Sequence, residues 1–366
     1  MNVVIFFGHH KVGSTALQTF LSQNIVELLQ SGILYPCVDF EGISVMTAKA
    51  LGRDIDNDKL PINFREAHNA LAFRMLRSEG GSKVPPYHKN LPSVQQMLNA
   101  IRKQIQYFEP HTILLTAEVF SHFAAIAPGA IKKLNHLFEE DNVRLMATLR
   151  RVDEYLISWH GQRLKFGNHV APLRKEATAR YFKSIHFDYQ LMLDGWLKGM
   201  PDAEIVLRNY ADVLVSGGAN EDFLHHSGVD FPKRLIPGKR KNVSLHRALM
   251  EIARLGNHKL PSTGARELRR FLNQVTPKLE LPKSGDIEMF GSHNRSLLAE
   301  RFAPIHEYLG RISGTSPFFP DVELIGQSRE IDELDAANSA LTQLRRLGDQ
   351  VPSPLVSDFL NSLELH

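Results

Sequence analysis

The fold is decided by residues 3–15, which read VVIFFGHHKVGST. Residues 3–7 form a short apolar run rich in β-branched and aromatic side chains, and such a run predicts a buried strand. Beyond Ser14 and Thr15, apolar residues recur at helical spacing. They are Leu17, Phe20, Leu21, Ile25, Leu28 and Leu29. We therefore expect a strand, a glycine-containing loop and a helix, in that order, with Gly32 ending the helix.

Similar patterns recur further along the chain. Apolar runs predict more strands, and amphipathic stretches between them predict helices. We expect strands at 112–117, 143–149 and 204–207, and helices at 130–138 and 153–165. Alternating strands and helices are typical of an α/β fold whose central, mostly parallel sheet is flanked by helices. The chain beyond residue 245 is mainly helical, with helices expected at 245–255, 264–271, 294–309 and 331–347.

A chain of 366 residues fits one large domain with additions. We place that domain at 1–310 and a helical C-terminal extension at 311–366. Residues 45–95 are less regular and hold several charges, with an exposed loop expected at 78–86, so they read either as a mobile, acceptor-side lid or as a plain surface insertion. The apolar face of the tail helix either packs on the body or forms a homo-oligomer. That face comprises Leu334, Leu341, Leu344 and Leu347.

Composition excludes few classes of protein. The net charge of +3 gives no general argument for nucleic-acid binding, although basic residues gather at 144–151 and 233–241. The single cysteine, Cys37, rules out an intrachain disulfide and reads as an ordinary small residue. The start lacks the pattern of a signal peptide, and no apolar run approaches the roughly 20 residues that span a bilayer. We therefore expect a cytoplasmic protein without a transmembrane segment.

The loop between the first strand and helix has the features of an anion site. Unpaired N–H groups and the helix dipole favour negative charge at a helix start. Gly13 allows a close backbone approach, Ser14 and Thr15 add hydroxyl donors, and Lys11 adds a full charge. Gly8 and Gly13 have the spacing of the P-loop pattern GxxxxGK[ST], but Ser14 stands where that pattern has lysine. A turn that binds nothing is the alternative.

The run HKVGST at 10–15 resembles the donor loop of sulfotransferases that use 3′-phosphoadenosine 5′-phosphosulfate (PAPS). Their pattern is K-x-G-[ST]-[ST] after the first strand. The resemblance implies a P-loop-like three-layer fold. It also implies that Lys11, Val12, Gly13, Ser14 and Thr15 hold the 5′-phosphosulfate. Val12 departs from the threonine or serine of many members.

A second segment is similar to the same family. Arg150 follows the predicted strand at 143–149, and Ser158 comes eight residues later. In the family, this pair binds the donor's 3′-phosphate, for which an arginine fork and a hydroxyl are suited. Arg151 could replace Arg150, although the spacing to Ser158 favours Arg150. Lys241, in a basic run that departs from the family's late R-K-G form, is a further candidate for donor binding.

Weaker similarities to bacterial members occur at 32–36, 155–162 and 242–245. They indicate a carbohydrate-type enzyme whose acceptor is a hydroxyl on a sugar or glycolipid. Lys11 is expected to stabilise the leaving phosphate. Glu118, directly after the strand at 112–117, is the first candidate for the general base and His10 the second, with His160 and Glu154 more remote.

The sequence therefore predicts a PAPS-dependent sulfotransferase that needs no metal. The histidines at 225 and 226 decorate a helix in this reading, because further metal ligands are lacking at usable spacing. A P-loop nucleotide kinase or NTPase is one alternative, and a non-catalytic protein that keeps the fold is another.

Overall fold

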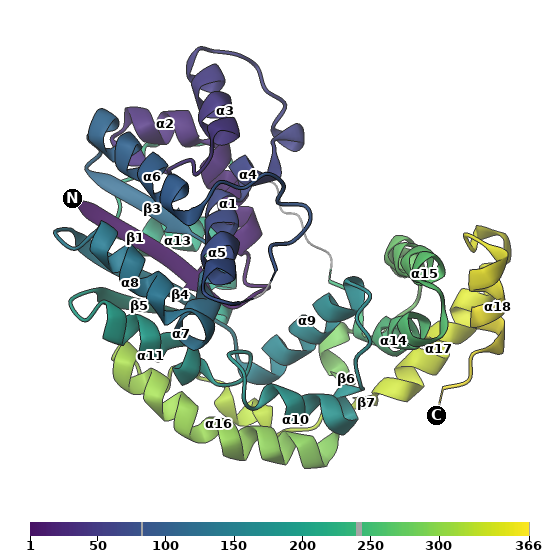
Figure 1. The fold of residues 1–366 in the computed structure, drawn as a ribbon. Helices are drawn as coiled ribbons and strands as arrows, with labels where there is room; N and C mark the ends of the chain where they lie inside the picture. The colour runs from purple at the N-terminus through teal and green to yellow at the C-terminus, as the bar shows by residue number, and fades with distance from the viewer. Residues whose placement is uncertain (82, 239–243, 366) are drawn as a thin grey trace. The chain divides into compact units, whose positions relative to one another are not determined.

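A computed structural model describes residues 1–81, 83–238 and 244–365 (Figure 1). The chain divides into two compact units, each made from three segments. Unit 1 comprises Met1–Arg150, Asp188–Lys241 and Ile305–Phe319. Unit 2 comprises Arg151–Phe187, Asn242–Pro304 and Pro320–His366. The predicted boundary at residue 310 falls inside helix α16 (Gly291–Ser313), which runs from unit 2 into unit 1.

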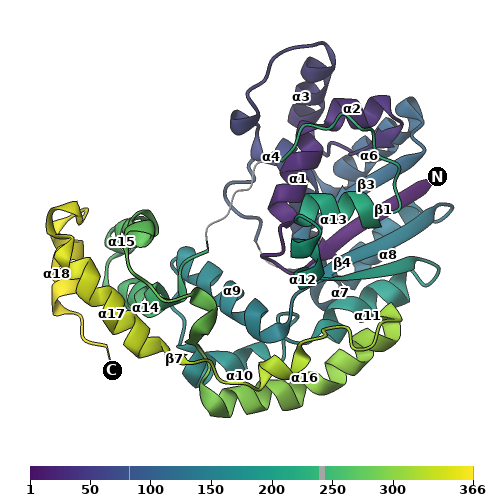
Figure 2. The ribbon, with the colours of Figure 1, turned by 180° about the vertical axis from the view of Figure 1, so that it is seen from behind.

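Unit 1 contains five strands, with helices between successive strands and after the last one (Figure 2). In chain order, its elements are β1 (Asn2–Gly8), α1 (Ser14–Gln23), α2 (Ile25–Gln30), β2 (Ile33–Leu34), α3 (Phe40–Ala50), η1 (Asn57–Lys59), α4 (Ile62–Arg65), α5 (Ala67–Ser78), α6 (Val94–Phe108), β3 (Thr112–Thr116), η2 (Glu118–His122), α7 (Phe123–Ile126), α8 (Pro128–Leu137), β4 (Asn142–Leu149), α11 (Tyr189–Gly199), β5 (Glu204–Asn209), α12 (Tyr210–Val215) and α13 (Ala219–His226).

Unit 2 is mainly helical and holds one short parallel strand pair. Its elements are α9 (Val152–Lys165), η3 (Leu173–Ala177), α10 (Thr178–Tyr181), η4 (Arg247–Leu249), α14 (Met250–Lys259), α15 (Ser262–Val275), η5 (Thr276–Lys278), η6 (Ser284–Asp286), β6 (Ile287–Glu288), most of α16, η7 (Val322–Ile325), β7 (Ile331–Asp332), α17 (Glu333–Arg346), η8 (Gly348–Gln350) and α18 (Pro354–Ser362).

The sheet of unit 1 is wholly parallel, with the strand order β2-β3-β1-β4-β5. The central strand β1 pairs Phe6 with Thr116 of β3 and Gly8 with Thr148 of β4. All four predicted strands are confirmed to within two residues at each end. The two-residue strand β2 was not predicted, because a strand of this length leaves no periodic signal.

Helices cover both faces of this sheet because β1 is apolar on both sides. Phe6 packs in one core cluster with side chains of α1 and with Phe223 of α13, whose ring centroid lies 5.8 Å away. Phe7 points to the opposite face and stacks on Trp196 of α11 at 4.8 Å. Trp196 in turn stacks on Phe123 of α7. The predicted α/β fold with a central parallel sheet between helical layers is therefore confirmed.

The first helix is shorter than predicted. α1 ends at Gln23 and α2 begins at Ile25, so the expected single helix is broken at Asn24. The Asn24 side chain accepts from the backbone N–H of Ile236 at 2.7 Å and donates to the carbonyl of Ile236 at 3.0 Å. The break therefore anchors a distant segment, which helical periodicity cannot reveal.

Residues 45–95, expected to be less regular, contain several helices separated by stretches without regular structure. Helix α3 ends in this range, α4 and α5 lie within it, and α6 begins at its end. Helix α5 buries Ala70, Leu71 and Met75, so it contributes to the core. Within the expected loop at 78–86, residues 83–86 lie in neither a helix nor a strand, and residue 82 lies outside the described residues.

The four helices predicted beyond residue 245 are present in altered form. The first begins as η4 and continues as α14, and the last begins as β7 before α17. α17 packs on α14, and α18 packs on α15, all within unit 2. Leu341 and Leu344 are buried, whereas Leu334 and Leu347 are half-buried. The tail helix therefore packs on its own unit as one of the two alternatives predicted.

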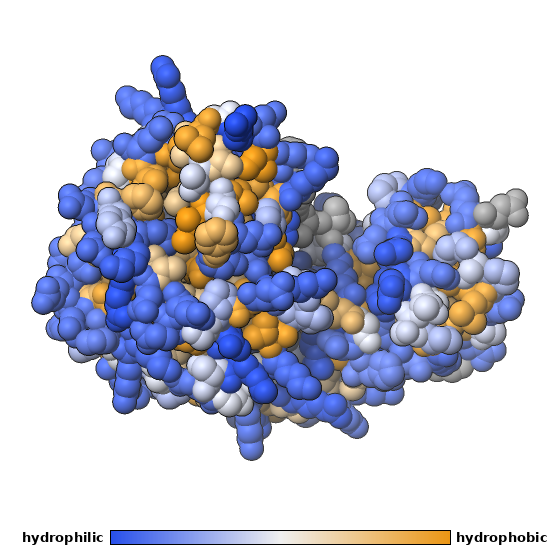
Figure 3. Space-filling model, turned by 45° about the horizontal axis from the view of Figure 1, so that its top comes forward, coloured by the Kyte–Doolittle hydropathy of each residue, from blue (hydrophilic) through white to orange (hydrophobic). Residues whose placement is uncertain are grey.

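Three further properties concern the length of the helices, the single cysteine and the apolar surface. Within the described ranges, every helix is too short or too polar to cross a lipid bilayer. Cys37 is buried, and burial raises the pKa of its thiol well above the usual value. Apolar side chains also reach the surface on the part of unit 1 that carries α2 and α3 (Figure 3). Phe40 and Leu51 are the most exposed large apolar residues of that part, at 84% and 75%.

The approach of β1 to β4 tests this architecture. A Cβ at Gly8 would lie 2.7 Å from the Thr148 carbonyl oxygen, so Gly8→Ala forces the two strands apart. We expect a loss of roughly 1–3 kcal/mol in the free energy of unfolding. Gly285→Ala is the control, because a Cβ there meets nothing within 4 Å. Urea unfolding measures both, and equal stability of the two variants contradicts the prediction.

Candidate functional site

The predicted site residues of unit 1 follow the carboxyl ends of three adjacent strands. The loop 9–13 follows β1, and Arg150 follows β4 directly. Glu118 follows β3 with one residue, Ala117, between them. The chain leaves β1 toward β2 on one side of the sheet and leaves β4 toward β5 on the other. Ligands of open parallel sheets bind at such a switch point. The topology therefore brings loop 9–13 and Arg150 to the position where a ligand is expected.

The loop has a strained backbone that only certain residues tolerate. Gly13, the residue before α1, has φ +95°, and a Cβ there would lie 2.6 Å from the Cβ of Ala219. Lys11 also has a positive φ, of 68°. A non-glycine residue in this region is uncommon and costs energy. The strain turns the chain so that α1 starts directly beyond it, with its free N–H groups at the loop.

Helix α1 carries unsatisfied polar atoms in its first two turns. Ser14 is 2% exposed, and among the described residues its Oγ has no hydrogen-bond partner. The same is true of both side-chain polar atoms of Gln18, which is fully buried one turn later. Buried polar groups are normally paired, so such atoms require an explanation. A hydroxyl without an acceptor at a helix N-terminus fits a bound anion.

Lys11, Glu118 and Arg150 form the charged part of the site. Burial lowers the pKa of Lys11, nearby Glu118 raises it, and Arg150 lowers it, with a net lowering. Burial raises the pKa of Glu118, but His10 and Lys11 together lower it below its usual value. Glu118 is therefore ionised at neutral pH. The ionised carboxylate of Glu118 and the amino group of Lys11 therefore interact electrostatically at this loop.

His10 connects Glu118 to a second imidazole. Its Nδ1 lies 3.1 Å from Glu118 Oε1, and its Nε2 lies 3.1 Å from Nε2 of His122. Burial and the neighbouring His10 lower the pKa of His122 to about 3, so His122 is neutral. Nδ1 of His10 must donate to the carboxylate, because an ionised carboxylate only accepts. Both ring nitrogens of His10 are thus engaged.

His9, which the sequence analysis missed, supports Arg150. The backbone N–H of Arg150 donates to Nδ1 of His9 at 3.3 Å, and the hydroxyl of Tyr189 donates to the Arg150 carbonyl at 2.7 Å. The rings of His9 and Tyr189 meet at 4.2 Å. Burial, His10 and Arg150 lower the pKa of His9 well below its usual value. Because two histidines are adjacent, the sequence alone could not say which one faces the ligand.

The guanidinium of Arg150 lies over the ring of Tyr210, 5.2 Å from its centroid. Tyr210 is the first residue of α12, directly after β5, so it comes from the neighbouring strand's carboxyl end. A cation over an aromatic face is held in place without losing its hydrogen-bond donors. This contact orients Arg150 by a residue that the sequence gave no reason to select.

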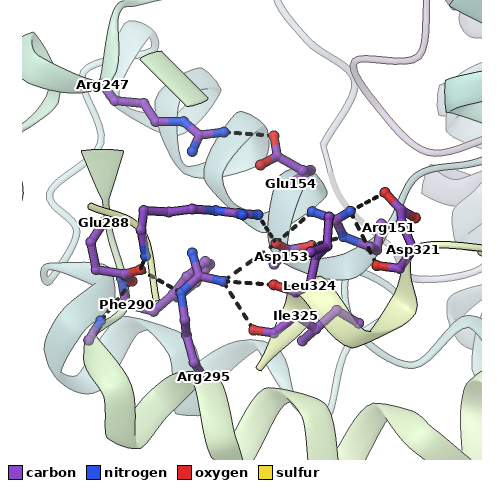
Figure 4. Close-up of polar contacts among 12 residues, drawn as sticks. Arg151, Asp153, Glu154, Arg247, Glu288, Phe290, Arg295, Asp321, Leu324 and Ile325 are labelled. Carbon is purple, nitrogen blue, oxygen red and sulfur yellow. Dashed lines mark hydrogen bonds and ion pairs between the residues drawn. The ribbon is translucent and has the colours of Figure 1, made fainter. Parts of the chain in front are cut away.

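Arg151 is held by carboxylates of unit 2 (Figure 4). Its Nε donates to Asp153 at 2.7 Å, and its Nη1 forms an ion pair with Asp321. Asp153 is fully buried and also pairs with Arg295 at 3.6 Å and Arg329 at 3.5 Å. These carboxylates occupy Arg151 in an intramolecular network. Arg151 is therefore engaged within unit 2.

The remaining predicted residues have different surroundings. Ser158 is half-buried on α9 of unit 2, whereas Arg150 belongs to unit 1, so their pairing stays a prediction. Glu154 pairs with Arg247 at 2.6 Å. Burial, Arg163 and Arg254 lower the pKa of His160 to about 3. Lys241 lies outside the described residues.

Two further predictions concern the adjacent histidines and metals. The histidines at 225 and 226 end helix α13, as expected for residues that decorate a helix. In residues 1–81, 83–238 and 244–365, no group of three or more His, Cys, Asp or Glu side chains is arranged to hold a metal ion.

Comparison with known proteins gives one weak similarity. A segment of 91 residues is 33% identical to a protein of Archaeoglobus fulgidus that is described only as uncharacterized. This segment is 25% of the present chain, and it spans 23% of the archaeal protein's length. No protein-family model matches the chain, and no solved structure matches it. The comparisons therefore assign no family.

The buried carboxylate of Asp153 gives a test of the unit 2 network. Asp153→Asn keeps the shape of the side chain but leaves the guanidinium groups of Arg151 and Arg295 without their common anion. We expect a loss of roughly 3–5 kcal/mol in the free energy of unfolding. Asp358→Asn, at an exposed position on α18 of the same unit, should change stability by less than about 0.5 kcal/mol. Urea unfolding that finds both variants equally stable would remove Asp153 from its central role.

Proposed function

We propose that the protein is a sulfotransferase that transfers a sulfuryl group from PAPS to a hydroxyl of a carbohydrate or glycolipid. The observation that carries the proposal is the unsatisfied Ser14 hydroxyl at the start of α1, beside the strained Lys11–Gly13 turn. This arrangement supports an anion site at residues whose sequence resembles the PAPS loop. The five-stranded parallel sheet supports a P-loop-like fold, and the position of Arg150 supports a role in donor binding.

The proposed reaction places each charge where the transfer needs it. The acceptor oxygen attacks sulfur, forming a new S–O bond, while the S–O bond to the 5′-phosphate breaks. The electron pair of that bond leaves with the phosphate. The ammonium of Lys11 and the N–H groups at the start of α1 stabilise the leaving oxygen. Burial makes these interactions stronger than they would be in water.

Glu118 is the better candidate for the base that takes the acceptor's proton. It is ionised, and it follows β3 close to Lys11, whose charge affects its pKa. His10 is less suited, because Glu118 engages its Nδ1 and His122 engages its Nε2. In this reading, His10 orients the carboxylate.

A nucleotide kinase remains the second candidate, because the same loop geometry suits other phosphates. Ser14 begins the helix at the position where a kinase has its phosphate-binding lysine. Lys11 lies three residues earlier and on the other side of Gly13. This displacement favours a donor whose reacting bond lies near the loop's first residues.

Ligand titration by calorimetry tests the donor site. Adenosine 3′,5′-bisphosphate should bind without metal at micromolar concentration, and ATP with Mg²⁺ should not bind. Lys11→Ala should weaken the bisphosphate about tenfold to a hundredfold, because a charge-assisted contact to the 5′-phosphate is lost. Lys198→Ala, whose side chain is 77% exposed on α11, is the control. Metal-dependent binding of ATP alone overturns the proposal in favour of a kinase.

Arg150 gives a second test with two ligands. Arg150→Ala should weaken adenosine 3′,5′-bisphosphate about tenfold or more, because the arginine is assigned to the 3′-phosphate. The same change should have little effect on adenosine 5′-monophosphate, which lacks that phosphate. An equal loss for both ligands shows instead that the Arg150 side chain only supports the site through its contact with the ring of Tyr210.

A further inference from the structure

A polar cluster at the junction of α4 and α5 lies close to the proposed site in unit 1. Glu66 is its centre: Oε1 accepts from Arg65 at 3.2 Å, and Oε2 accepts from Asn69 at 3.3 Å. These residues belong to the region expected from sequence to face the acceptor. None of them is used by the proposed donor site.

His68 holds this cluster against the end of β3. Its Nδ1 accepts from the backbone N–H of Thr116 at 3.0 Å, and its Nε2 donates to the Pro36 carbonyl at 3.0 Å. Burial lowers its pKa to about 3, although the Pro36 bond raises it, so the ring stays neutral and can accept at Nδ1. Thr116 precedes Glu118 by two residues, and helix α5 packs on η2, which begins at Glu118. Helix α5, which carries Asn69, therefore lies beside the element that begins at Glu118.

The cluster contains buried polar atoms that lack partners. Asn69 is 3% exposed and His88 is 4% exposed. Among the described residues, Oδ1 of Asn69, Nε of Arg65 and Nε2 of His88 have no hydrogen-bond partner. Together, they offer acceptors and donors within one small region. Hydroxyl groups match such a mixed set, because each hydroxyl both donates and accepts.

Tyr87 connects the cluster to a surface groove. Burial, Glu66 and Glu118 each raise the pKa of Tyr87. The ring is nevertheless 53% exposed. It lines a groove of about 570 Å³ together with Phe40, Asn63 and Lys89. Flat aromatic surface beside polar side chains suits a sugar ring, which has apolar C–H faces and polar edges.

The charges of this region are close to balanced. Arg65 pairs with Glu66, and Asp39 is used as the cap of α3, where it accepts from Gly42 at 2.7 Å. Glu41 and Lys89, which also line the groove, carry opposite charges. A balanced groove gives a strongly charged polymer no electrostatic advantage. It favours an uncharged ligand.

We propose that this surface is the acceptor subsite and that it binds a neutral oligosaccharide. The reacting sugar lies against Asn69 and Arg65 beside Glu118, and adjoining sugars lie over Tyr87 toward Phe40. The inference rests on the proposed sulfotransferase function, since Glu118 serves there as the base. Asn69 and Tyr87 are binding residues in this assignment and have no part in holding the donor.

Binding of three neutral hexasaccharides tests the subsite: maltohexaose, cellohexaose and chitohexaose, each measured by saturation-transfer NMR with the full chain. At least one should bind, and Tyr87→Ala should weaken it about tenfold, because a stacking surface is removed. Tyr107→Ala is the matched control, since Tyr107 is 73% exposed on α6 and lies outside the groove. Asn69→Ala should weaken the same sugar, because the unpaired acceptor Oδ1 is lost.

The outcomes separate this inference from the proposed function. If no hexasaccharide binds, or if Tyr87→Ala and Tyr107→Ala bind equally well, the subsite is wrong. Calorimetry with adenosine 3′,5′-bisphosphate is run on the same samples. Bisphosphate binding without sugar binding overturns the subsite and leaves the donor site standing. Sugar binding that depends on Tyr87, without bisphosphate binding, supports the subsite and overturns the sulfotransferase.

Discussion

The parallel pairing of β1 with β3 on one side and β4 on the other is the constraint on which the candidate site depends. The register brings Phe6 opposite Thr116 and Gly8 opposite Thr148, so the three strands end together. Three groups of the proposed chemistry then follow strand ends: Lys11 after β1, Glu118 after β3 and Arg150 after β4. Gly8 keeps β1 and β4 close at this edge, because any side chain there would meet the Thr148 backbone. The positions of the groups that the proposed reaction needs therefore depend on the register of the sheet in unit 1.

The parts of the fold that could be predicted are those with a local signal. Strands β1, β3, β4 and β5 are apolar runs between turns, and their apolar side chains indicate that they are buried. Two kinds of feature had no such signal. Asn24 breaks the first helix because its side chain binds the backbone of a residue more than 200 positions away. Helix α5 was not predicted, because its role is to fill the core and local sequence does not show this. Both are consequences of tertiary contacts, which override local preference.

For the site, the type and order of the candidate residues could be predicted from the sequence. The contacts that hold these residues in position could not. Lys11, Ser14, Glu118 and Arg150 are identifiable because each is a charged or polar residue just after a predicted strand. His9, Tyr189 and Tyr210 hold Arg150 through a backbone bond, a carbonyl and a ring face. None of these contacts depends on a motif. His9 and His68 play the same part, since each is a buried neutral imidazole whose Nδ1 accepts from the backbone at a strand end.

The ion network of unit 2 has a consequence for the order in which the chain is made. Arg151 and Asp321 are 170 residues apart, and Asp153 finds Arg295 and Arg329 only when those residues have also been synthesised. On the ribosome, the charged start of α9 therefore emerges long before its counter-ions. Until the distant partners arrive, only Arg151 and water can satisfy Asp153, because burying an insufficiently paired carboxylate is costly. Unit 2 can complete this network only after residue 329 has emerged, and a nascent chain halted near residue 319 would keep this segment open to chaperones and proteases.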